Sequence, residues 1–371
     1  MNLADLDFKV SFPAIRGIQA KREYYLVMCP IRYVTRLFSF DEKGEVPAEM
    51  RAQRVLNQSR VPEIARYIIE NNDNYCLSAI TASVDGDIEF VPVAERGGNR
   101  NIGTLIVPME ARFIVNDGQH RRAALQLALE ECPELADETI AVVLFIDAGL
   151  KRSQQMFADL NKHAVRPTRS LGILYDQRDP MAGMVRNLVQ SVPVFNGWTE
   201  LEKTTISNRS TKIFTLSNIY QATQMLLRKK RKDPVFEEDE ALSYEFWTEM
   251  TTHIPEWQQI ADGDVVAVTV RENYLHVHGV VLKAMGIAGA DLFKHYPNDW
   301  QARLKRLRRI NWSRHNKALW EGRAMELGKI RRSQDNIRLT ANVLKKRLGL
   351  ALNDKEAILE ANFEKPSRNR K

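Results

Sequence analysis

The chain has 371 residues, 44% of them hydrophobic and 27% charged, with a formal net charge of +7. This length favours two domains, and the lack of a long apolar run or a leader-type N-terminus predicts a soluble, cytoplasmic protein with no membrane span. The three cysteines, Cys29, Cys76 and Cys132, are far apart and form no CxxC pair. We therefore expect neither a disulfide framework nor a zinc site.

Strand-type and helix-type patterns alternate through the first half of the chain. Strand-type runs are expected within residues 8–38 and at 75–84, 88–94, 104–115 and 140–146. Helical spacing covers 54–72, 119 to about 135, and 151–164, where Pro167 is expected to end the helix. This alternation predicts an α+β protein whose N-terminal domain, residues 1–180, is mixed α/β.

The second half changes to a mainly helical pattern. Helices are predicted over residues 181–192, 215–232, 241–260 and 268–286, ahead of a basic region. The change of pattern puts the domain boundary between residues 178 and 195, so residues 181–371 are predicted to form a mainly α-helical C-terminal domain. The five basic residues 228–232 are interpreted as an exposed helix end and loop.

The positive charge is concentrated near the C-terminus. Residues 301–350 contain 15 lysines and arginines against three acids, a local balance of +12 that leaves −5 for the rest of the chain. Neutralising phosphates releases counterions, so such a segment predicts a DNA-binding surface. A solvated helical face is the alternative.

A helical pattern in this basic region separates an apolar face from the cations. The shared face comprises Trp300, Leu304, Leu307 and Asn311. We expect the three tryptophans of this region, Trp300, Trp312 and Trp320, to lie in the core. The residues predicted to contact DNA are Arg303, Lys305, Arg306, Arg308, Arg309 and Arg314.

A second candidate DNA contact is the stretch KTTISNRSTK, residues 203–212. It contains Lys203, Arg209 and Lys212 with five hydroxyl groups, one amide and no acid. These are the usual donors to the phosphate backbone, which position a protein on DNA without reading its sequence. A plain surface loop is an equal alternative.

The stretch NDGQHRR, residues 116–122, places cations at the start of a predicted helix. Free backbone amides at a helix start bind anions, and Gly118 permits close approach of the backbone. His120, Arg121 and Arg122 would add charge-assisted bonds to a phosphate. Asp117 could bind Mg²⁺ carried by a nucleotide, act as a base or cap the helix. A capped helix with exposed arginines is the alternative.

Two histidines, His276 and His278, stand two residues apart in HVHG. On a helix this spacing points the two rings to different faces, whereas a helical zinc pair is four residues apart. We expect no metal there.

The run DGQHR, residues 117–121, resembles the signature of the DGQHR-domain family, best known from the DndB proteins of DNA phosphorothioate (sulfur) modification. The resemblance extends from about Arg51 to Leu350. The stretches that carry it are RVLNQSRVPEIARYI, FADLNKHAVRPTRSLGILYDQRD, TISNRSTKIFTLSNIY and INWSRHNKALWEGRAM. The resemblance implies a ParB-like N-terminal domain followed by a helical domain.

The resemblance also implies a function. It points to a transcriptional regulator, a repressor, that binds double-stranded DNA at the promoter of its own phosphorothioate-modification gene cluster, and it allows contact with phosphorothioate DNA and a homo-oligomer. It implies binding or hydrolysis of ATP, with or without Mg²⁺, at the DGQHR site. The alternative is a ParB-like nucleotide-hydrolysing or nuclease-type enzyme within the modification system.

Residue roles follow from the same resemblance. Asp117 and His120 are the catalytic candidates. The predicted nucleotide or phosphate contacts are Gly118, Gln119, Arg121, Arg122 and Asn161. For Asn161 an ordinary amphipathic helix, with Met156, Phe157, Leu160 and Ala164 as its buried stripe, is equally compatible.

Cys29 lies between Met28 and Pro30 and is expected to be a buried structural thiol. Because the family concerns sulfur in the DNA backbone, the alternative is a soft contact between this thiol and a phosphorothioate sulfur.

Overall fold

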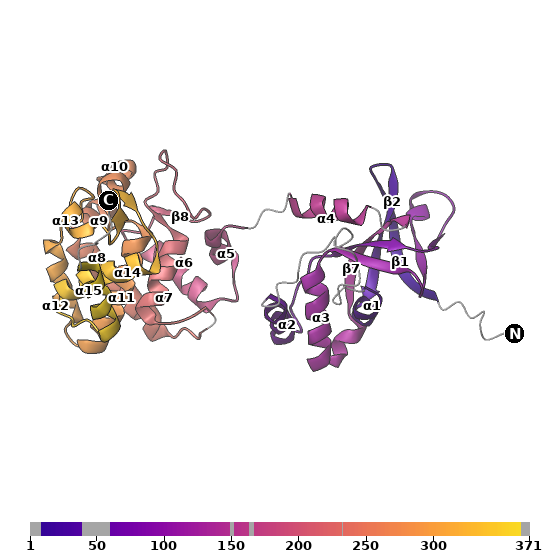
Figure 1. Cartoon of the computed structure of the whole chain (residues 1–371), viewed down its shortest axis with the longest axis horizontal. Helices are drawn as coiled ribbons and strands as arrows, with labels where there is room; N and C mark the ends of the chain where they lie inside the picture. The colour runs from indigo at the N-terminus through magenta and orange to yellow at the C-terminus, as the bar shows by residue number, and fades with distance from the viewer. Residues whose placement is uncertain (1–8, 39–59, 149–151, 163–166, 232, 365–371) are drawn as a thin grey trace. The chain divides into compact units, whose positions relative to one another are not determined.

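The computed structural model describes residues 9–38, 60–148, 152–162, 167–231 and 233–364. Contacts divide the chain into two compact units, Met1–Val165 and Arg166–Lys371 (Figure 1). The first unit holds a seven-stranded sheet and the second is mainly helical. This confirms the predicted mixed α/β unit followed by a helical one. The likeness of the first unit to ParB stays a prediction.

The sheet of the first unit is mixed. Its strands are β1 (Lys9–Gln19), β2 (Arg22–Pro30), β3 (Ile80–Asp85), β4 (Glu89–Pro92), β5 (Ile102–Pro108), β6 (Arg112–Asp117) and β7 (Thr139–Ile146). The order is β4-β5-β1-β2-β7-β3-β6, and β3 and β7 run parallel. The edge strand β6 therefore ends at Asp117, where the DGQHR turn begins.

Helices cover one face of this sheet. They are α1 (Ile31–Leu37), α2 (Arg60–Glu70) and α3 (Gln119–Glu131), and α4 (Ser153–Lys162) contacts β6. Alternate strand residues such as Val27, Ala82 and Val142 are at most 1% exposed and share one core with Ile68 of α2 and Leu125 of α3. Period-two burial of this kind is expected of a sheet with one covered face.

Three predictions for this half were wrong in detail. The single strand expected at 104–115 is divided into β5 and β6 by a turn, in which the Ala111 amide donates to the Pro108 carbonyl. Residues 31–37 form α1 instead of extending the strand, because Ile31 and Val34 are buried against the core. The helix after the DGQHR turn ends at Glu131 because Pro133 begins a separate 3-10 turn. Residues 39–40 and 54–59 lie outside the described residues.

The second unit is built around α11. Its helices are α5 (Arg169–Tyr175), α6 (Pro180–Ser191), α7 (Leu216–Leu227), α8 (Glu237–His253), α9 (Pro255–Asp262), α10 (Ala267–Asn273), α11 (Gly279–His295), α12 (Trp300–Leu304), α13 (Lys317–Trp320), α14 (Gln334–Leu348) and α15 (Asp354–Glu364). Two short strand pairs, Thr199–Glu200 with Phe214–Thr215 and Met325–Glu326 with Lys329–Ile330, complete it. Helix α11 packs against α7 and α14. Gly286 allows this close approach, since a Cβ there would lie 2.2 Å from the Ala222 carbonyl oxygen.

Helices α5 and α6 both belong to the second unit, because they pack against α7. The division of the chain in the structure therefore precedes the boundary expected at residues 178–195. Every described helix is too short or too polar to span a lipid bilayer.

Candidate functional site

The DGQHR turn joins the edge strand β6 to α3 through a left-handed residue. Gly118 has φ +101°, and a Cβ there would lie 3.0 Å from Arg121 Nη2 and 3.1 Å from Ile80 Cγ1. Glycine is therefore required both by the backbone angle and by the space available. The first backbone bond of the helix runs from the Arg122 amide to the Gly118 carbonyl, 2.9 Å. The backbone amides of the first turn have no carbonyl partner within the helix, and they would supply any anion site here.

Two side chains of the motif point into the protein. Gln119 is 7% exposed, and its Nε2 donates to the carbonyls of Val115 (2.9 Å) and Asn116 (3.2 Å). Arg122 is 9% exposed and donates to the Thr35 carbonyl at 2.8 Å. These bonds fix the turn to its surroundings, so the geometry does not favour the nucleotide contacts predicted for Gln119 and Arg122.

Arg121 connects the start of α3 with the segment before β3. Its guanidinium donates to Ser78 Oγ (2.6 Å), the Ala79 carbonyl (3.0 Å) and Asp117 Oδ2 (2.8 Å). The Arg121 side chain is 21% exposed and that of Asp117 is 47% exposed. Asp117 thus keeps an accessible carboxylate beside the helix start, and His120 is partly exposed next to it. Arg121 already has protein partners that a phosphate would have to share.

Helix α4 is anchored next to this turn at its N-terminal end. Ser153 Oγ donates to Asn116 Oδ1 (2.5 Å), and Asn116 Nδ2 donates to Ser83 Oγ (2.8 Å). Asn161 lies in the last turn of α4, about 12 Å further along the helix axis by its rise alone. Its side chain lies outside the described residues, as does all of Ala164. The predicted buried stripe is wrong at Leu160, which is 43% exposed.

The loop at residues 203–212 is held in place by one arginine. Arg271, at the end of α10, donates to the backbone carbonyls of Ser207 (3.1 Å), Asn208 (3.1 Å), Ser210 (3.0 Å) and Lys212. No motif or periodicity in the sequence indicates a role for Arg271. The loop is consequently a fixed platform and not a free chain segment.

The platform carries exposed cations. Lys203 and Arg209 are exposed, and neither side chain forms an ion pair within the described part of the chain, although the backbone amide of Lys203 donates to Glu200 Oε1 at 3.2 Å. Lys212 Nζ donates to the Gly197 carbonyl at 2.7 Å. Arg314 lies at the same end of α10, because its guanidinium donates to the carbonyls of Glu272 (3.1 Å) and Gly328 (2.9 Å). Arg314 and Arg271 therefore both lie at the C-terminal end of α10.

The remaining predicted cations form a second group on α12 and the 3-10 turn Lys305–Arg309. Leu304, Leu307 and Ile310 are buried, whereas Asn311 is exposed, so the predicted helical face was wrong at its last residue. A 3-10 turn has three residues per turn, which brings Ile310 into the position that an α-helix would give Asn311. The three tryptophans of this region are buried, as predicted.

The cations of this second group differ in whether protein partners already hold their side chains or leave them available to contact DNA. Arg303 pairs with Asp299 at 3.2 Å, Arg306 donates to the Leu348 carbonyl at 3.2 Å, and Arg308 donates to the Thr252 carbonyl at 3.1 Å. Lys305 and Arg309 are exposed without an acidic partner among the described residues. Figure 1 shows α12 and α10 at different ends of the helical unit, so the two basic groups are separate.

The comparison with protein-family models covers almost the whole chain. The model of the family "DndB: DNA-sulfur modification-associated" matches residues 12–351. The chain belongs to the DndB family. A search of curated proteins and a search of solved structures each gave no match. Membership of the DndB family associates the chain with DNA-sulfur modification and so suggests interaction with DNA.

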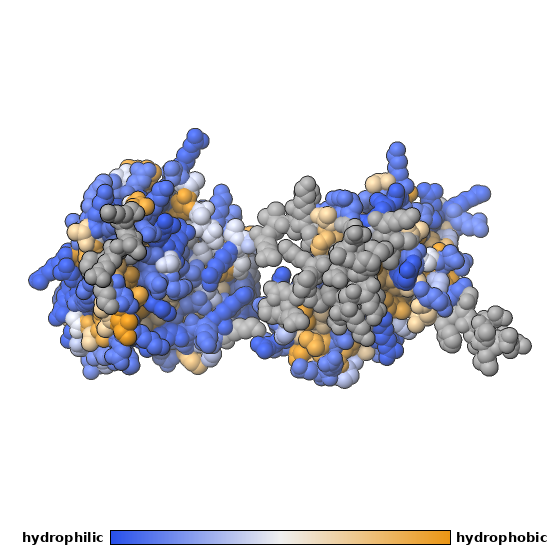
Figure 2. Space-filling view, in the orientation of Figure 1, coloured by the Kyte–Doolittle hydropathy of each residue, from blue (hydrophilic) through white to orange (hydrophobic). Residues whose placement is uncertain are grey.

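Part of the positive charge in residues 301–350 of this DndB-family chain, carried by three of its fifteen cations, is neutralised by acids elsewhere in the unit. Arg323 pairs with Glu360 at 2.7 Å, Lys346 with Glu360 at 2.8 Å, and Lys345 with Glu356 and Asp291. These acids lie outside the counted segment, so the local balance of +12 overstates the charge available to DNA. Figure 2 shows that hydrophilic side chains nevertheless cover most of the visible face of the helical unit.

Cys29 is buried in the sheet of the DndB-family chain. It is 1% exposed, its Sγ donates to the Pro30 carbonyl at 3.6 Å, and burial raises the pKa of the thiol to about 12. The expected structural thiol is confirmed. A direct contact between Cys29 and a phosphorothioate sulfur does not fit, because the thiol has no access to the surface.

The two histidines of HVHG have different partners. His276 is fully buried, accepts a hydrogen bond from Trp257 Nε1 at 3.0 Å, and stacks on Tyr274. His278 Nε2 lies 2.9 Å from the Arg271 carbonyl, and burial lowers the pKa of His278 to about 4, so the neutral ring is the donor. Both rings are therefore structural, and that of His278 supports Arg271. Among the described residues, no three His, Cys, Asp or Glu side chains are grouped to hold a metal ion.

Proposed function

We propose that this DndB-family chain is a DNA-binding transcriptional regulator, a repressor, of the gene cluster for DNA sulfur modification. The observation that carries the proposal is the loop 203–212, which Arg271 holds through four backbone carbonyls. The family membership supplies the DNA-sulfur context. The helical unit supplies the surface.

The chemistry of this loop suits a DNA backbone. Lysine, arginine, hydroxyl and amide groups make most phosphate contacts in protein–DNA complexes. A loop already fixed by Arg271 loses little conformational entropy when it binds, so more of the contact energy contributes to affinity. Lys203 and Arg209 supply the charge, and Arg314 lies at the end of α10 that also carries Arg271.

Lys305 and Arg309 form the second proposed DNA contact. They are exposed and lack acidic partners in the described ranges, unlike the paired Arg303. Because the two groups lie apart on one unit, a duplex that touches both would be contacted over more than one phosphate cluster. We assign the loop 203–212 as the primary contact, since it adds hydroxyl and amide groups to its cations.

ATP is the proposed modulator, bound at the first turn of α3. Support for this comes from the backbone amides that helix geometry leaves without a carbonyl partner after the left-handed Gly118, and from the carboxylate of Asp117 beside them, whose side chain is 47% exposed. Binding would shift the chain between conformations with different DNA affinity. Hydrolysis at this turn is the enzymatic alternative, and phosphate release by Asp117→Ala and Arg121→Ala variants distinguishes it from binding alone.

The test of the regulatory role is a titration of the full chain against its own promoter fragment and an unrelated duplex over a salt series. We expect tighter binding to the promoter at every salt concentration, with both affinities falling as salt rises. Equal affinities at all salts would reduce the role to non-specific binding of polyanions and would contradict the repressor proposal.

A further inference from the structure

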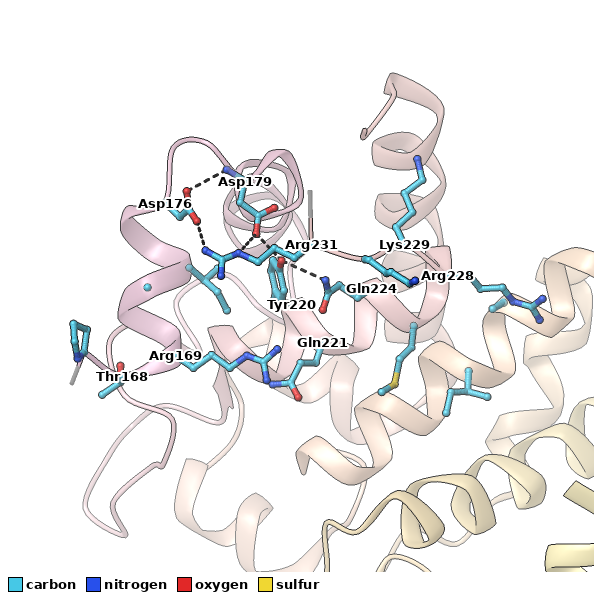
Figure 3. Close-up of a pocket in the computed structure, with 17 residues that line it drawn as sticks. Thr168, Arg169, Asp176, Asp179, Tyr220, Gln221, Gln224, Arg228, Lys229 and Arg231 are labelled. Atoms are coloured by element: carbon cyan, nitrogen blue, oxygen red, sulfur yellow. Dashed lines mark hydrogen bonds and ion pairs between the residues drawn. The ribbon is translucent and has the colours of Figure 1, made fainter. Parts of the chain in front are cut away.

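A pocket of about 890 Å³ opens on the helical unit between α5, α7 and α11 (Figure 3). Helix α5 contributes Arg169 and Gly172, α7 contributes Gln221 and Met225, and α11 contributes Ile287. The volume lies within the range of pockets that hold small organic ligands. The sequence patterns gave no indication of this pocket, and the basic residues 228–231 along its rim were interpreted as a solvated helix end.

One wall of the pocket is a closed polar network. The Tyr220 hydroxyl donates to Asp179 Oδ2 at 2.6 Å, and Arg231 Nη2 donates to Asp176 Oδ2 at 2.7 Å (Figure 3). Arg231 Nε lies 3.6 Å from Asp179 Oδ2. Both carboxylates of the lining are therefore already engaged by their neighbours. They fix the shape of the wall and do not neutralise the other cations.

Two cations of the lining remain available. Arg228 pairs with Asp291 and Lys229 with Asp239. Arg169 and Lys230 are exposed, and no ion pair of either side chain is found within the described residues, although the backbone amide of Lys230 donates to Asp233 Oδ2 at 2.7 Å. Burial is the main cause that lowers the pKa of Lys283 on α11, and the positive charges of Arg169 and Arg332 lower it further, so Arg169 contributes a positive field on this side. Such a field selects an anionic group.

The rest of the lining suits a flat ring. Met225 of α7 and Ile287 of α11 give it apolar side chains. Gln224 Nε2 donates to the Tyr220 hydroxyl at 3.3 Å, and Gln221 Nε2 donates to the Ser217 carbonyl at 2.8 Å. These bonds orient both amides and leave their Oε1 atoms as acceptors for an exocyclic amine. Figure 3 shows Arg169 extending toward Gln221 across the pocket.

We propose that this pocket binds a nucleoside phosphate, with the phosphates at Arg169 and Lys230 and the base against Met225 and Ile287. An apolar surface with a few oriented polar groups and a cationic rim matches both halves of such a ligand. This site is distinct from the DGQHR turn, and the proposal does not depend on the turn or on DNA binding.

The pocket also adjoins the DNA-contact loop. Ser170 Oγ donates to the Lys203 carbonyl at 2.9 Å, and Thr168 Oγ1 donates to the Glu202 carbonyl. A ligand phosphate on Arg169 would therefore reduce the positive charge beside the start of the loop. The resulting effect, a lower DNA affinity in the presence of ligand, rests on the proposed function.

The experiment is isothermal titration of the full chain with ATP, inorganic tripolyphosphate and adenosine. We expect ATP to bind more tightly than either fragment, and Lys230→Ala to weaken ATP binding by about tenfold through loss of one charge-assisted contact. Gly172→Leu should weaken ATP binding at least as much, because the leucine side chain would occupy pocket space that the ligand needs. Nothing lies within 4 Å of a Cβ at Gly172, so the substitution does not disturb the surrounding protein. Lys355→Ala removes the same charge from an exposed position on α15 and is expected to stay within about twofold of wild type.

The pattern of affinity losses among the variants shows where ATP binds. Weaker binding in Lys230→Ala and Gly172→Leu, with Arg121→Ala unchanged, supports the pocket and removes the DGQHR turn as the ATP site. Partial losses in both sets support two sites. Loss in Arg121→Ala alone, absence of ATP binding to the wild-type chain, or equal affinities for ATP and tripolyphosphate would each overturn the nucleoside-phosphate proposal. Promoter binding, measured in parallel without ATP, tests the DNA proposal separately.

Discussion

Replacing Glu360 by glutamine tests how the last two helices of the helical unit are held. Glu360 on α15 is 4% exposed and accepts two bonds from Arg323 (2.7 and 3.0 Å), one from Lys346 (2.8 Å) and one from Asn342 (3.0 Å). Arg323 is itself only 9% exposed. The substitution keeps the shape of Glu360 and removes the charge that compensates the buried guanidinium.

The expected cost follows from the burial of the pair. Removing one partner of a buried ion pair costs about 3–5 kcal/mol of unfolding free energy, because the other charge stays buried. The pKa of Glu360 gives a similar figure. Burial alone would raise this pKa, but the hydrogen bonds from Arg323, Lys346 and Asn342 outweigh burial and lower it from 4.5 to about 2. At about 1.4 kcal/mol per pH unit, this shift corresponds to roughly 3 kcal/mol at neutral pH.

The sign of the pH dependence is fixed by the lowered pKa. The contribution of Glu360 to the unfolding free energy is fully present above its ordinary pKa of about 4.5, and it is lost as the pH falls toward about 2. Urea unfolding followed by circular dichroism should therefore show Glu360→Gln less stable than wild type by about 3 kcal/mol at pH 7, with a smaller difference at pH 3.

The matched control is Arg331→Ala, which breaks an exposed pair with Glu326 whose side chains are 52% and 40% exposed. Its cost should stay below about 1 kcal/mol. A Glu360→Gln variant within 1 kcal/mol of wild type at pH 7, or one whose deficit is the same at pH 3 and pH 7, would refute the reasoning.

Two further substitutions and one labelling experiment test the local geometry. Gly118→Ala forces a left-handed alanine against Ile80 and should lower unfolding free energy by about 1–3 kcal/mol in thermal melts, and a neutral result would contradict the turn geometry. Arg271→Met should speed amide hydrogen exchange in loop 203–212 and weaken DNA binding several-fold while exchange in α14 is unchanged; an unaltered loop would show that other contacts hold it. Iodoacetamide at pH 8 should label exposed Cys76 and spare folded Cys29, whose pKa burial raises to about 12, and equal labelling of both by mass spectrometry would contradict the burial.

Local pattern predicted most of the elements and the class of the fold. Alternation of apolar residues located the strands, and helical spacing located α3, α6 and α7, because both periods report which side of an element faces the core. The helices predicted over residues 241–260 and 268–286 were wrong in extent: the first is divided into α8 and α9 at Pro255, and the second into α10 and α11 by the non-helical residues 274–278. The errors came where tertiary contacts decide. Residues 31–37 have strand-type composition but form α1, since Ile31 and Val34 complete the core around α3.

The candidate sites were harder to predict from the sequence than the fold. Charge counting located the basic segment but could not show that Glu356 and Glu360, beyond its end, neutralise Lys345 and Arg323. Motif spacing located the DGQHR turn but not the inward direction of Gln119 and Arg122. The role of Arg271 depends on a loop about sixty residues earlier in the chain, and only the folded chain brings the two together.

The central claim is that loop 203–212 holds the DNA backbone. It is tested most directly by the salt dependence of duplex affinity for wild type and for the double variant Lys203→Ala, Arg209→Ala, with Lys355→Ala as the charge-matched control. The slope of log affinity against log salt should become shallower by about 1.8 in the double variant, since each phosphate contact contributes about 0.9, and stay unchanged in the control. An unchanged slope in the double variant would contradict the claim.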